Sequence, residues 1–266
     1  MAQMVFKRYE IKYQLTNEQR TRLEQVMAEH MIPDEYGPST VRNIYYDTPD
    51  HLLARRSAEH PYYKEKLRIR SYVSAGDETK VFLELKKKCD GIVYKRRCTL
   101  PLAEAHALLM GQREPETQIE REIAFSARRY EGLEAAMFVA YDREAYYAAD
   151  DHEFRMTFDR AVRCRWDDIR LAGDTEGKLL MGSDQNLLEV KCAQGMPLWL
   201  VDFFSAEGIR KGSFSKYGTA VTHQLAQETA AASAWVARPL TGARHLRSPQ
   251  APRPIRRPAA LKPAFA

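Results

Sequence analysis

Basic side chains recur at alternate positions in several short segments of this chain. The residues of this kind are Lys12, Lys66, Arg68, Arg70, Lys86, Lys95, Arg97, Arg143, Arg155 and Lys191. Side chains two residues apart on a β-strand lie on the same face, about 7 Å apart. Arginine presents a planar fork of donors that suits phosphate oxygens, whereas lysine offers a point charge. The pattern therefore predicts a face that binds a polyanion, with a chain of phosphates as the best fit.

A glutamate stands two residues before a lysine in three separated segments. These pairs are Glu10 and Lys12, Glu84 and Lys86, and Glu189 and Lys191. Cations gathered in an enclosed space repel one another, so acidic neighbours and a bound anion must offset the cost of removing them from water. Carboxylates can also hold Mg²⁺ or Mn²⁺ against phosphate oxygens. The three glutamates are candidates for both roles.

A simpler interpretation exists for each segment taken alone. An antiparallel sheet with one solvated face alternates in the same way, and Glu–Lys neighbours form common cross-strand pairs. The segments taken together favour a ligand site, because Ser, Thr, Gln and Asn are nearly absent from these positions and arginine is concentrated at Arg68 and Arg70. We therefore predict that the basic faces converge on one enclosed lumen.

The elements that would carry these residues follow from the hydrophobic periodicity. Alternating segments predict strands at 4–15, 40–48, 63–73, 80–88, 92–100, 137–148, 154–166 and 186–192. Helices are predicted at 17–31 with Thr16 as N-cap, at 51–58, over 101–137 with a break at 113–116, at 197–208, and after Tyr217. This order predicts an α+β fold in which about eight antiparallel strands close into a barrel with flanking helices.

The C-terminal segment differs in composition from the rest of the chain. Of the 266 residues, the last thirty, 237–266, carry seven Arg or Lys and no acidic residue, and because the net charge is +5, residues 1–236 sum to −2. We predict one folded domain at 1–236 and a disordered basic tail at 237–266. Four scattered cysteines and the lack of a signal segment or of a run of about 18 apolar residues predict a cytoplasmic protein with reduced thiols.

A series of motifs resembles the catalytic domain of the vacuolar transporter chaperone (VTC) family, a polyphosphate polymerase domain within the triphosphate tunnel metalloenzyme (CYTH-like) superfamily. In order, the motifs are RYEIKY, YYDTP, KEKLRIR, FLELKKK, YKRR, YDREAY, FRMTFDR, LLEVK and FSKY, from about Phe6 to Gly218. The resemblance implies an eight-stranded antiparallel tunnel that grips a phosphate chain. It also implies transfer of the terminal phosphoryl group of ATP onto a growing polyphosphate chain with a divalent metal, Mn²⁺ or Mg²⁺.

The resemblance also implies roles for individual residues. The family's phosphate-contacting positions fall on Lys12, Arg68, Arg70, Lys86, Lys95, Arg143, Arg155 and Lys216, and its metal-associated position falls on Glu189. We add Lys191 as a catalytic candidate, and Lys66, Arg97, Lys211, Lys216 and Tyr217 as candidates for phosphate binding. Eukaryotic members carry a further lysine three places before Lys216, where this chain has Ser213, and Lys211 is the candidate substitute.

The function predicted first is an ATP-dependent polyphosphate polymerase, whose partners are ATP and inorganic polyphosphate. A hydrolase of triphosphate or short polyphosphates and a non-catalytic polyphosphate-binding module stay open as alternatives. Specific binding of nucleic acid is the weakest option, because the cations lie on inward-facing positions without interleaved exposed aromatic residues. Eukaryotic relatives are fused to transmembrane modules, which this sequence lacks, so export of product would need a separate membrane protein.

Overall fold

The computed structural model describes residues 9–59, 61–90, 92–193 and 195–236. The chain divides into two compact units, residues 1–225 and 226–266. The first unit contains every strand of the described chain, and the second is described only for the last part of helix α6 (Lys216–Val236). The tail predicted at 237–266 and the first residues of the strand predicted at 4–15 lie outside the described residues.

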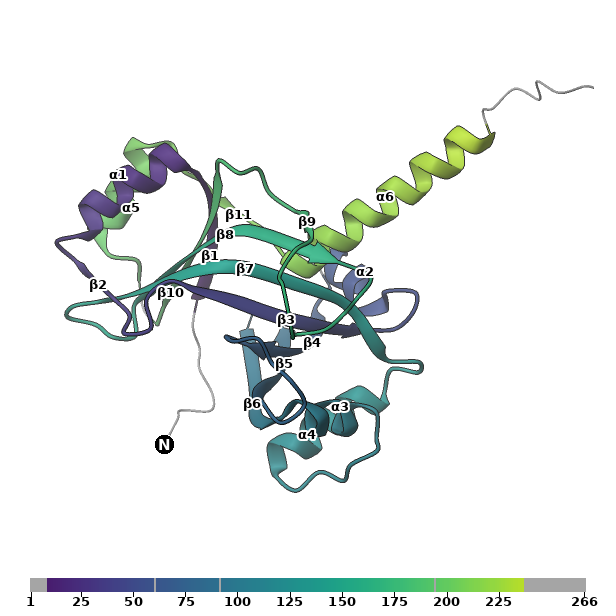
Figure 1. Ribbon diagram of the computed structural model, residues 1–266. Coiled ribbons are helices and arrows are strands. Elements are labelled where there is room, and N and C mark those ends of the chain that lie inside the picture. Colours follow the sequence, from purple (N-terminus) through teal and green to yellow (C-terminus); the bar gives the residue numbers. More distant parts are fainter. Residues whose placement is uncertain (1–8, 60, 91, 194, 237–266) are drawn as a thin grey trace, which may run out of the picture. The chain divides into compact units, whose positions relative to one another are not determined.

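One antiparallel sheet dominates the first unit (Figure 1). Its long strands are β1 (Tyr9–Thr16), β3 (Ser39–Asp47), β4 (Tyr63–Ser71), β5 (Lys80–Cys89), β6 (Ile92–Pro101), β7 (Glu134–Ala148), β8 (Arg155–Arg165) and β10 (Gln185–Cys192). Its short strands are β2 (Met31–Pro33), β9 (Lys178–Leu179) and β11 (Lys211–Gly212). The helices are α1 (Asn17–Met27), α2 (Leu52–Ala58), α3 (Leu102–Leu109), α4 (Gln118–Arg128), α5 (Leu198–Ala206) and α6.

The closed barrel of eight strands is not confirmed. The sheet has eleven strands in the order β11-β1-β10-β8-β7-β3-β4-β5-β6, with β2 and β9 paired to β7 and β8 outside this path. Within the described residues, no ladder joins β6 to β11. The two halves of the sheet nevertheless meet through side chains, because Nζ of Lys86 on β5 lies 2.9 Å from both carboxylate oxygens of Glu10 on β1. The sheet therefore curls into an open, concave layer.

Local sequence explains several of the element boundaries. Helix α1 begins with the predicted cap, where the Thr16 hydroxyl accepts from the backbone of Gln19 and the Gln19 side chain accepts from the backbone of Thr16. The hairpins β4–β5 and β5–β6 also follow the predicted segments. The helix predicted over 101–137 is wrong at its end: α4 stops at Arg128, and β7 begins at Glu134 because its apolar residues pair with β3.

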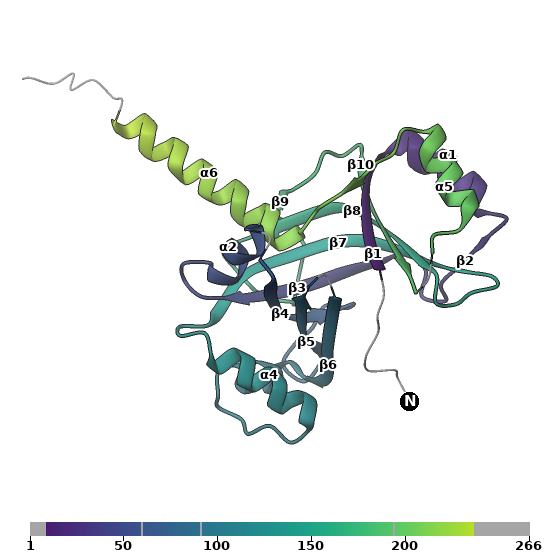
Figure 2. The same ribbon diagram turned by 180° about the vertical axis from the view of Figure 1, so that it is seen from behind.

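Helices α1 and α5 cover one part of the convex face (Figures 1 and 2). Leu23 and Met27 of α1, together with Leu200 and Phe204 of α5, form one apolar cluster with the strand residues that alternate with the charged ones. Val190 belongs to this cluster, for example, and its neighbours Glu189 and Lys191 therefore point to the other face. Packing on the convex face thus fixes which side chains face the concave side.

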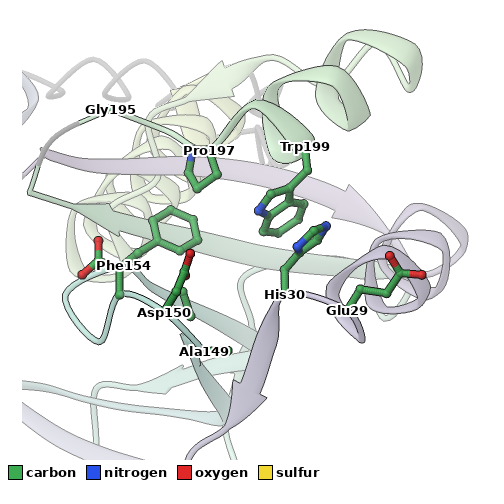
Figure 3. Close-up of a pocket in the computed structure, with 10 residues that line it drawn as sticks. Glu29, His30, Ala149, Asp150, Phe154, Gly195, Pro197 and Trp199 are labelled. Carbon is green, nitrogen blue, oxygen red and sulfur yellow. The ribbon is translucent and has the colours of Figure 1, made fainter.

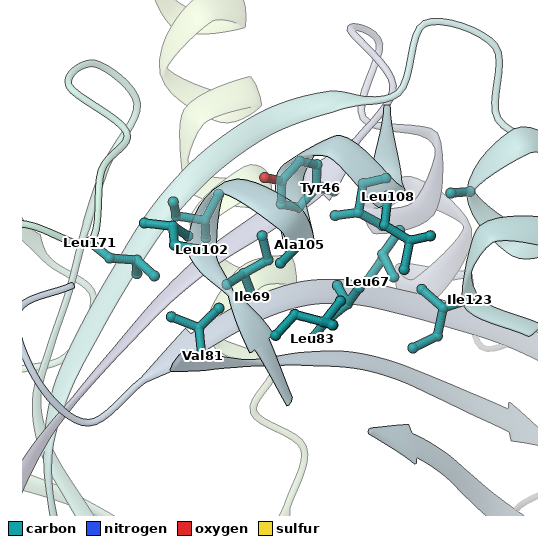
Figure 4. Close-up of a cluster of buried hydrophobic side chains, with 14 of the residues drawn as sticks. Tyr46, Leu67, Ile69, Val81, Leu83, Leu102, Ala105, Leu108, Ile123 and Leu171 are labelled. Atoms are coloured by element: carbon teal, nitrogen blue, oxygen red, sulfur yellow. The ribbon is translucent and has the colours of Figure 1, made fainter. Parts of the chain in front are cut away.

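A second apolar cluster covers the convex face of β4 and β5 (Figure 4). Leu67 and Ile69 of β4 pack with Leu83 of β5 against Ala105 and Leu108 of α3. Burying side chains of this size contributes about 1.5–3 kcal/mol each relative to leaving them exposed. The cluster therefore holds the cations of β4 and β5 on the opposite, concave face.

The concave face is apolar in one part and charged in the rest. The first turns of α6 pack there, with Tyr217 and Val221 in a buried cluster that includes Val139 of β7 and Tyr45 of β3. This part of the face is therefore filled by the protein itself.

Among the helices of the described residues, none has both the length and the hydropathy needed to cross a bilayer.

Candidate functional site

Glu84 lies at the centre of the cations on β4, β5 and β6. Its carboxylate accepts from Nε of Arg68 at 2.7 Å and from Nε of Arg97 at 2.6 Å, and it lies 2.7 Å from Nζ of Lys95. The strand register places Arg68, Glu84 and Arg97 side by side in one row across the sheet. The sequence motifs KEKLRIR, FLELKKK and YKRR therefore converge on one carboxylate.

The charge of Glu84 is stabilised by these neighbours. The side chain is 1% exposed, and burial alone would raise its pKa, but the positive charges of Arg68 and Arg70 with those of β6 lower the pKa well below its usual range. Glu84 is therefore ionised at neutral pH. The cations around it outnumber it, so the cluster keeps positive charge for an incoming anion.

A second carboxylate organises the opposite wall. Arg143 on β7 donates two hydrogen bonds to Asp159 on β8, at 2.6 and 2.7 Å, and Nζ of Lys216 at the start of α6 lies 2.5 Å from the same carboxylate. Burial opposes ionisation of Asp159, but Arg143 and Lys216 lower its pKa to about 2. Nη2 of Arg70 donates to the Tyr141 hydroxyl at 2.9 Å, which links this wall to β4.

Glu189, the predicted metal ligand, faces three of the predicted cations. Its carboxylate oxygens lie 4.0 Å from Nζ of Lys12, 3.5 Å from Nη2 of Arg143 and 3.8 Å from Nζ of Lys191. Burial would raise the pKa of Glu189, but Lys191 and a contact with Glu10 lower it well below its usual range, with Lys12 and Arg143 adding to the effect. A pair of carboxylates, Glu10 and Glu189, thus lies between the two walls.

Unlike most of the cations around it, Lys66 forms no ion pair with a carboxylate in the described part of the chain. Its Nζ lies 2.6 Å from Oγ of Ser215, a residue 149 positions away in the sequence. Burial and the positive charges of Lys12 and Lys86 lower the pKa of Lys66 to about 7. Lys66 is therefore close to half protonated at neutral pH, and a bound anion would favour its charged form.

The motif YYDTP has a positioning role that the sequence did not reveal. The Tyr45 hydroxyl accepts from Nη1 of Arg68 at 3.0 Å, and the Tyr45 ring stacks on Tyr217 with centroids 4.9 Å apart. The Tyr217 hydroxyl donates to Asp47, which also accepts from the backbone N–H groups of Leu53 and Ala54 in α2. Asp47 therefore ties β3, α2 and α6 together behind Arg68.

Three predicted residues do not join the cluster in the expected way. Tyr217 uses its hydroxyl on Asp47 within the apolar part of the face. Lys211 is paired with Tyr13, whose side chain lies in the cluster under α5, so Lys211 lies on the convex side and gains no support as a substitute for a lysine at Ser213. Arg155 lies in register with Lys191, but it is exposed and Nε donates to the carbonyl of His152.

The other predicted residues are brought together on the concave face. They are Lys12, Lys66, Arg68, Arg70, Lys86, Lys95, Arg97, Arg143, Glu189, Lys191 and Lys216. Sequence reasoning missed Asp159, Tyr141 and Ser215 as members of the cluster. The alternation signal was present for the first two, since Asp159 stands four residues from Arg155 and Tyr141 stands two from Arg143. Ser215 had no such signal.

A cavity of about 450 Å³ lies away from this cluster (Figure 3). It is lined by the stacked rings of His30 and Trp199, with Glu29 and Asp150 nearby. Phe154 of its lining belongs to the apolar cluster under α1 and α5, which places the cavity on the convex side. Its carboxylates would repel a phosphate chain, so it is not a candidate for that ligand.

Comparison with known families matches this arrangement. The family model of the VTC domain matches residues 7–224, which includes every strand and every residue of the basic cluster. The chain belongs to the VTC domain family. This match confirms the resemblance to the family that was based on the series of motifs from RYEIKY through FSKY. A separate comparison with curated proteins found no significant match to the sequence.

Solved structures with similarity to this VTC domain include two proteins described as cyclases. A Bacillus halodurans protein provisionally described as an adenylate cyclase is 15% identical, with a TM-score of 0.50, over 80% of this chain and 96% of its own. A Hippeastrum protein provisionally described as an adenylyl cyclase, with a dominant triphosphatase activity, is 16% identical, with a TM-score of 0.48, over 80% of this chain and 95% of its own. The similarity to the Bacillus halodurans structure shows that that protein and the VTC domain share a fold.

Proposed function

We propose that this VTC domain is a metal-dependent polyphosphate polymerase, which transfers the γ-phosphoryl group of ATP onto a polyphosphate chain. The observation that supports the proposal most is the convergence of cations from β1, β4, β5, β6, β7, β10 and α6 on one concave face, around a few buried carboxylates. Such a face needs a polyanion to complete its charge balance.

The orientation of the arginines suits phosphoryl transfer. Arg68 is held by Glu84 and Tyr45, and Arg143 is held by Asp159, so their donors are arranged before a ligand arrives. Phosphoryl transfer requires positioning and stabilisation of developing charge more than covalent help. Donors held in place stabilise that charge without reorganising during the reaction. Lys12 and Lys216 would add charge at the same place.

The residues present fit a divalent cation. No group of three or more potential protein ligands is arranged for a metal within the described part of the chain. Mg²⁺ needs only one or two carboxylates when substrate phosphates supply further oxygens, and Mn²⁺ accepts similar ligands. Glu189 and its neighbour Glu10 would hold the ion. When bound, the ion would neutralise charge on the phosphate oxygens.

A polymerase and a hydrolase on this face would differ only in the acceptor of the phosphoryl group. The first test is therefore to incubate the purified protein with ATP and Mn²⁺ and to measure chain product and free phosphate in the same reaction. Long phosphate chains are expected. Free phosphate without chains would indicate a hydrolase, and tight binding of polyphosphate without turnover would indicate a binding module.

Variants with matched charge changes test the site itself. Arg68→Ala is expected to lower kcat by about 10²-fold, the usual effect of removing one preorganised donor. Glu189→Ala is expected to abolish the formation of chains with Mn²⁺, because the ion loses a carboxylate that would hold it. Lys211→Ala removes a cation from the convex side and should leave the activity within about twofold. If Arg68→Ala behaved like Lys211→Ala, the site would be wrongly placed.

ATP and inorganic polyphosphate are the proposed partners of the domain, and the cytoplasm is its proposed location. A separate membrane protein is a further proposed partner, for export of the product. These proposals depend on the polymerase activity, and the product assay above tests them first.

A further inference from the structure

The side chains on the basic face differ between the two ends of β4, β5 and β6. Rows of side chains cross these strands in register. From one end to the other they are Lys64 with Lys88, then Lys66 with Lys86 and Lys95, then Arg68 with Glu84 and Arg97, then Arg70 with Phe82 and Thr99. Two rows of lysines are thus followed by arginines and an aromatic ring.

Aromatic and arginine side chains meet at the last of these rows. Tyr72 continues the alternation of Arg68 and Arg70, and its ring lies 5.9 Å from Phe82 at 80°. Cζ of Arg97 lies 4.4 Å from the centroid of the Phe82 ring. Tyr72 is 41% exposed, so part of the residue is accessible to a ligand.

The Tyr72 hydroxyl faces the cations of both walls. Burial would raise the pKa of Tyr72, but the positive charges of Arg70, Arg97 and Arg143 lower it. Arg143 belongs to β7 on the opposite wall, so this end of the face is bounded by aromatic rings and by arginines from three strands.

The aromatic residue at the lysine end points elsewhere. Tyr62 is 71% exposed, and its hydroxyl interacts with Cys89 and lies near Tyr94. Cys89 and Tyr94 alternate with Lys88 and Lys95, so they lie on the convex side. On its concave face the lysine end therefore offers the charges of its lysines and the side chain of Val93, which is in register with Lys88.

A nucleoside triphosphate has two chemically different halves. Its flat base stacks on aromatic rings and on guanidinium planes, and such stacking tolerates any base. Its phosphates need cations, which lysine supplies without a planar surface. The arginine–aromatic end fits the nucleoside half, and the lysine rows fit phosphates alone.

We propose that the nucleoside of the substrate docks against Tyr72 and Phe82, with its phosphates directed toward Arg70 and Arg68, and that the phosphate chain occupies the lysine rows that end at Lys64 and Lys88. This assigns a direction to the concave face: nucleotide at one end and phosphate chain at the other. The inference rests on the proposed function in one respect, that the substrate is a nucleoside triphosphate.

The test compares binding of two ligands that differ only in the nucleoside. Affinities for a non-hydrolysable ATP analogue and for inorganic tripolyphosphate are measured by calorimetry with Mn²⁺. Tyr72→Ala is expected to weaken binding of the ATP analogue about tenfold, in the range for loss of one stacking partner, and to leave tripolyphosphate binding unchanged. Tyr72→Phe keeps the ring and should bind the analogue like the wild type.

Tyr62→Ala is the matched control, since it removes an exposed tyrosine at the other end. It should change neither affinity. The inference would be overturned if Tyr72→Ala weakened the binding of both ligands equally. It would also be overturned if Tyr62→Ala lost affinity for the ATP analogue alone. A wild-type protein that bound tripolyphosphate but not the analogue would overturn it as well. These measurements require no polymerisation, so a protein that makes no chains would refute the proposed function while leaving the nucleoside site supported.

Discussion

Glu84 balances the charge of the β4–β6 wall at the scale of single residues. One carboxylate, 1% exposed, contacts Arg68, Lys95 and Arg97 within 2.7 Å. Removing one partner from a buried charge network leaves the others uncompensated, which costs more than the pair contributes when intact. A bound anion would supply the missing charge.

Glu84→Gln is therefore expected to lower the free energy of unfolding by about 3 kcal/mol in the absence of ligand. Tripolyphosphate should raise the thermal midpoint of the variant by more than that of the wild type, as measured by calorimetry. Glu122→Gln is the control, because it removes one partner of Arg96 from a partly exposed pair and should cost less than about 1 kcal/mol. If tripolyphosphate raised the thermal midpoint of Glu84→Gln and of the wild type equally, Glu84 would not balance the charge of this wall.

Lys66 makes phosphate binding dependent on pH. Its pKa in the free protein is about 7, and a bound anion raises it, so binding takes up a proton above that pH. Affinity for tripolyphosphate is expected to be fully present below pH 7 and to fall by up to tenfold per pH unit above it. In Lys66→Arg the guanidinium stays charged, so the part of the decline that Lys66 causes should vanish, whereas Lys95, whose pKa burial also lowers to about 7, keeps its own contribution.

The comparison uses the ratio of wild-type to Lys66→Arg affinities, measured by calorimetry between pH 6 and 9. Titration of the ligand itself cancels in this ratio. A ratio that stayed constant across the range would show that Lys66 keeps its proton in the free protein.

Asp47 connects three elements behind the basic face. It is fully buried at the end of β3, caps the start of α2 through two backbone N–H groups, and accepts from Tyr217 at 2.7 Å. Tyr217 follows Lys216, whose Nζ contacts Asp159. The position of Lys216 therefore depends on a contact made by the neighbouring residue on the apolar part of the face.

Asp47→Asn is expected to lower the free energy of unfolding by about 1–3 kcal/mol, because an amide leaves a buried donor unpaired. It should also raise KM for ATP, since α6 no longer holds Lys216 firmly. Asp50→Asn is the control, an exposed carboxylate close by that pairs with Arg55, and should leave the stability close to that of the wild type. Chemical denaturation and steady-state kinetics measure both effects. An unchanged KM in Asp47→Asn would disprove the coupling to Lys216.

The open seam of the sheet matters at the scale of the whole first unit. β1 and β5 lie far apart in the order of the strands, yet Lys86 reaches Glu10 across the concave face. Edges of a sheet without backbone partners exchange their amide hydrogens more readily than central strands. A polyanion that contacts Lys12 and Lys86 together would hold the two halves of the sheet against each other.

Tripolyphosphate is therefore expected to slow amide hydrogen exchange in β1, β5 and β6, as measured by mass spectrometry. Chloride at equal ionic strength should have no such effect, because it cannot span the two walls. Protection confined to β7 and β8 would mean that the ligand binds one wall only.

Sequence reasoning was most accurate where structure is local. Alternation along a strand depends on the geometry of that strand, so it predicted the shared faces of Lys66, Arg68 and Arg70 and of Glu189 and Lys191. The Thr16 cap and the β5–β6 hairpin likewise depend on neighbouring residues. The match to the VTC domain follows from the same motifs in their order.

The amino-acid sequence by itself thus determined the eight long strands apart from some of their ends, the alternation of faces along them and the family, but it did not predict β2, β9 or β11. Only the tertiary structure decided that Asp159, Ser215 and Tyr141 join the cations, that Lys211 lies on the convex side, and that the sheet stays open between β6 and β11. The reason is physical: alternation is a property of one segment, whereas pairing, register and curling depend on contacts between residues far apart along the chain.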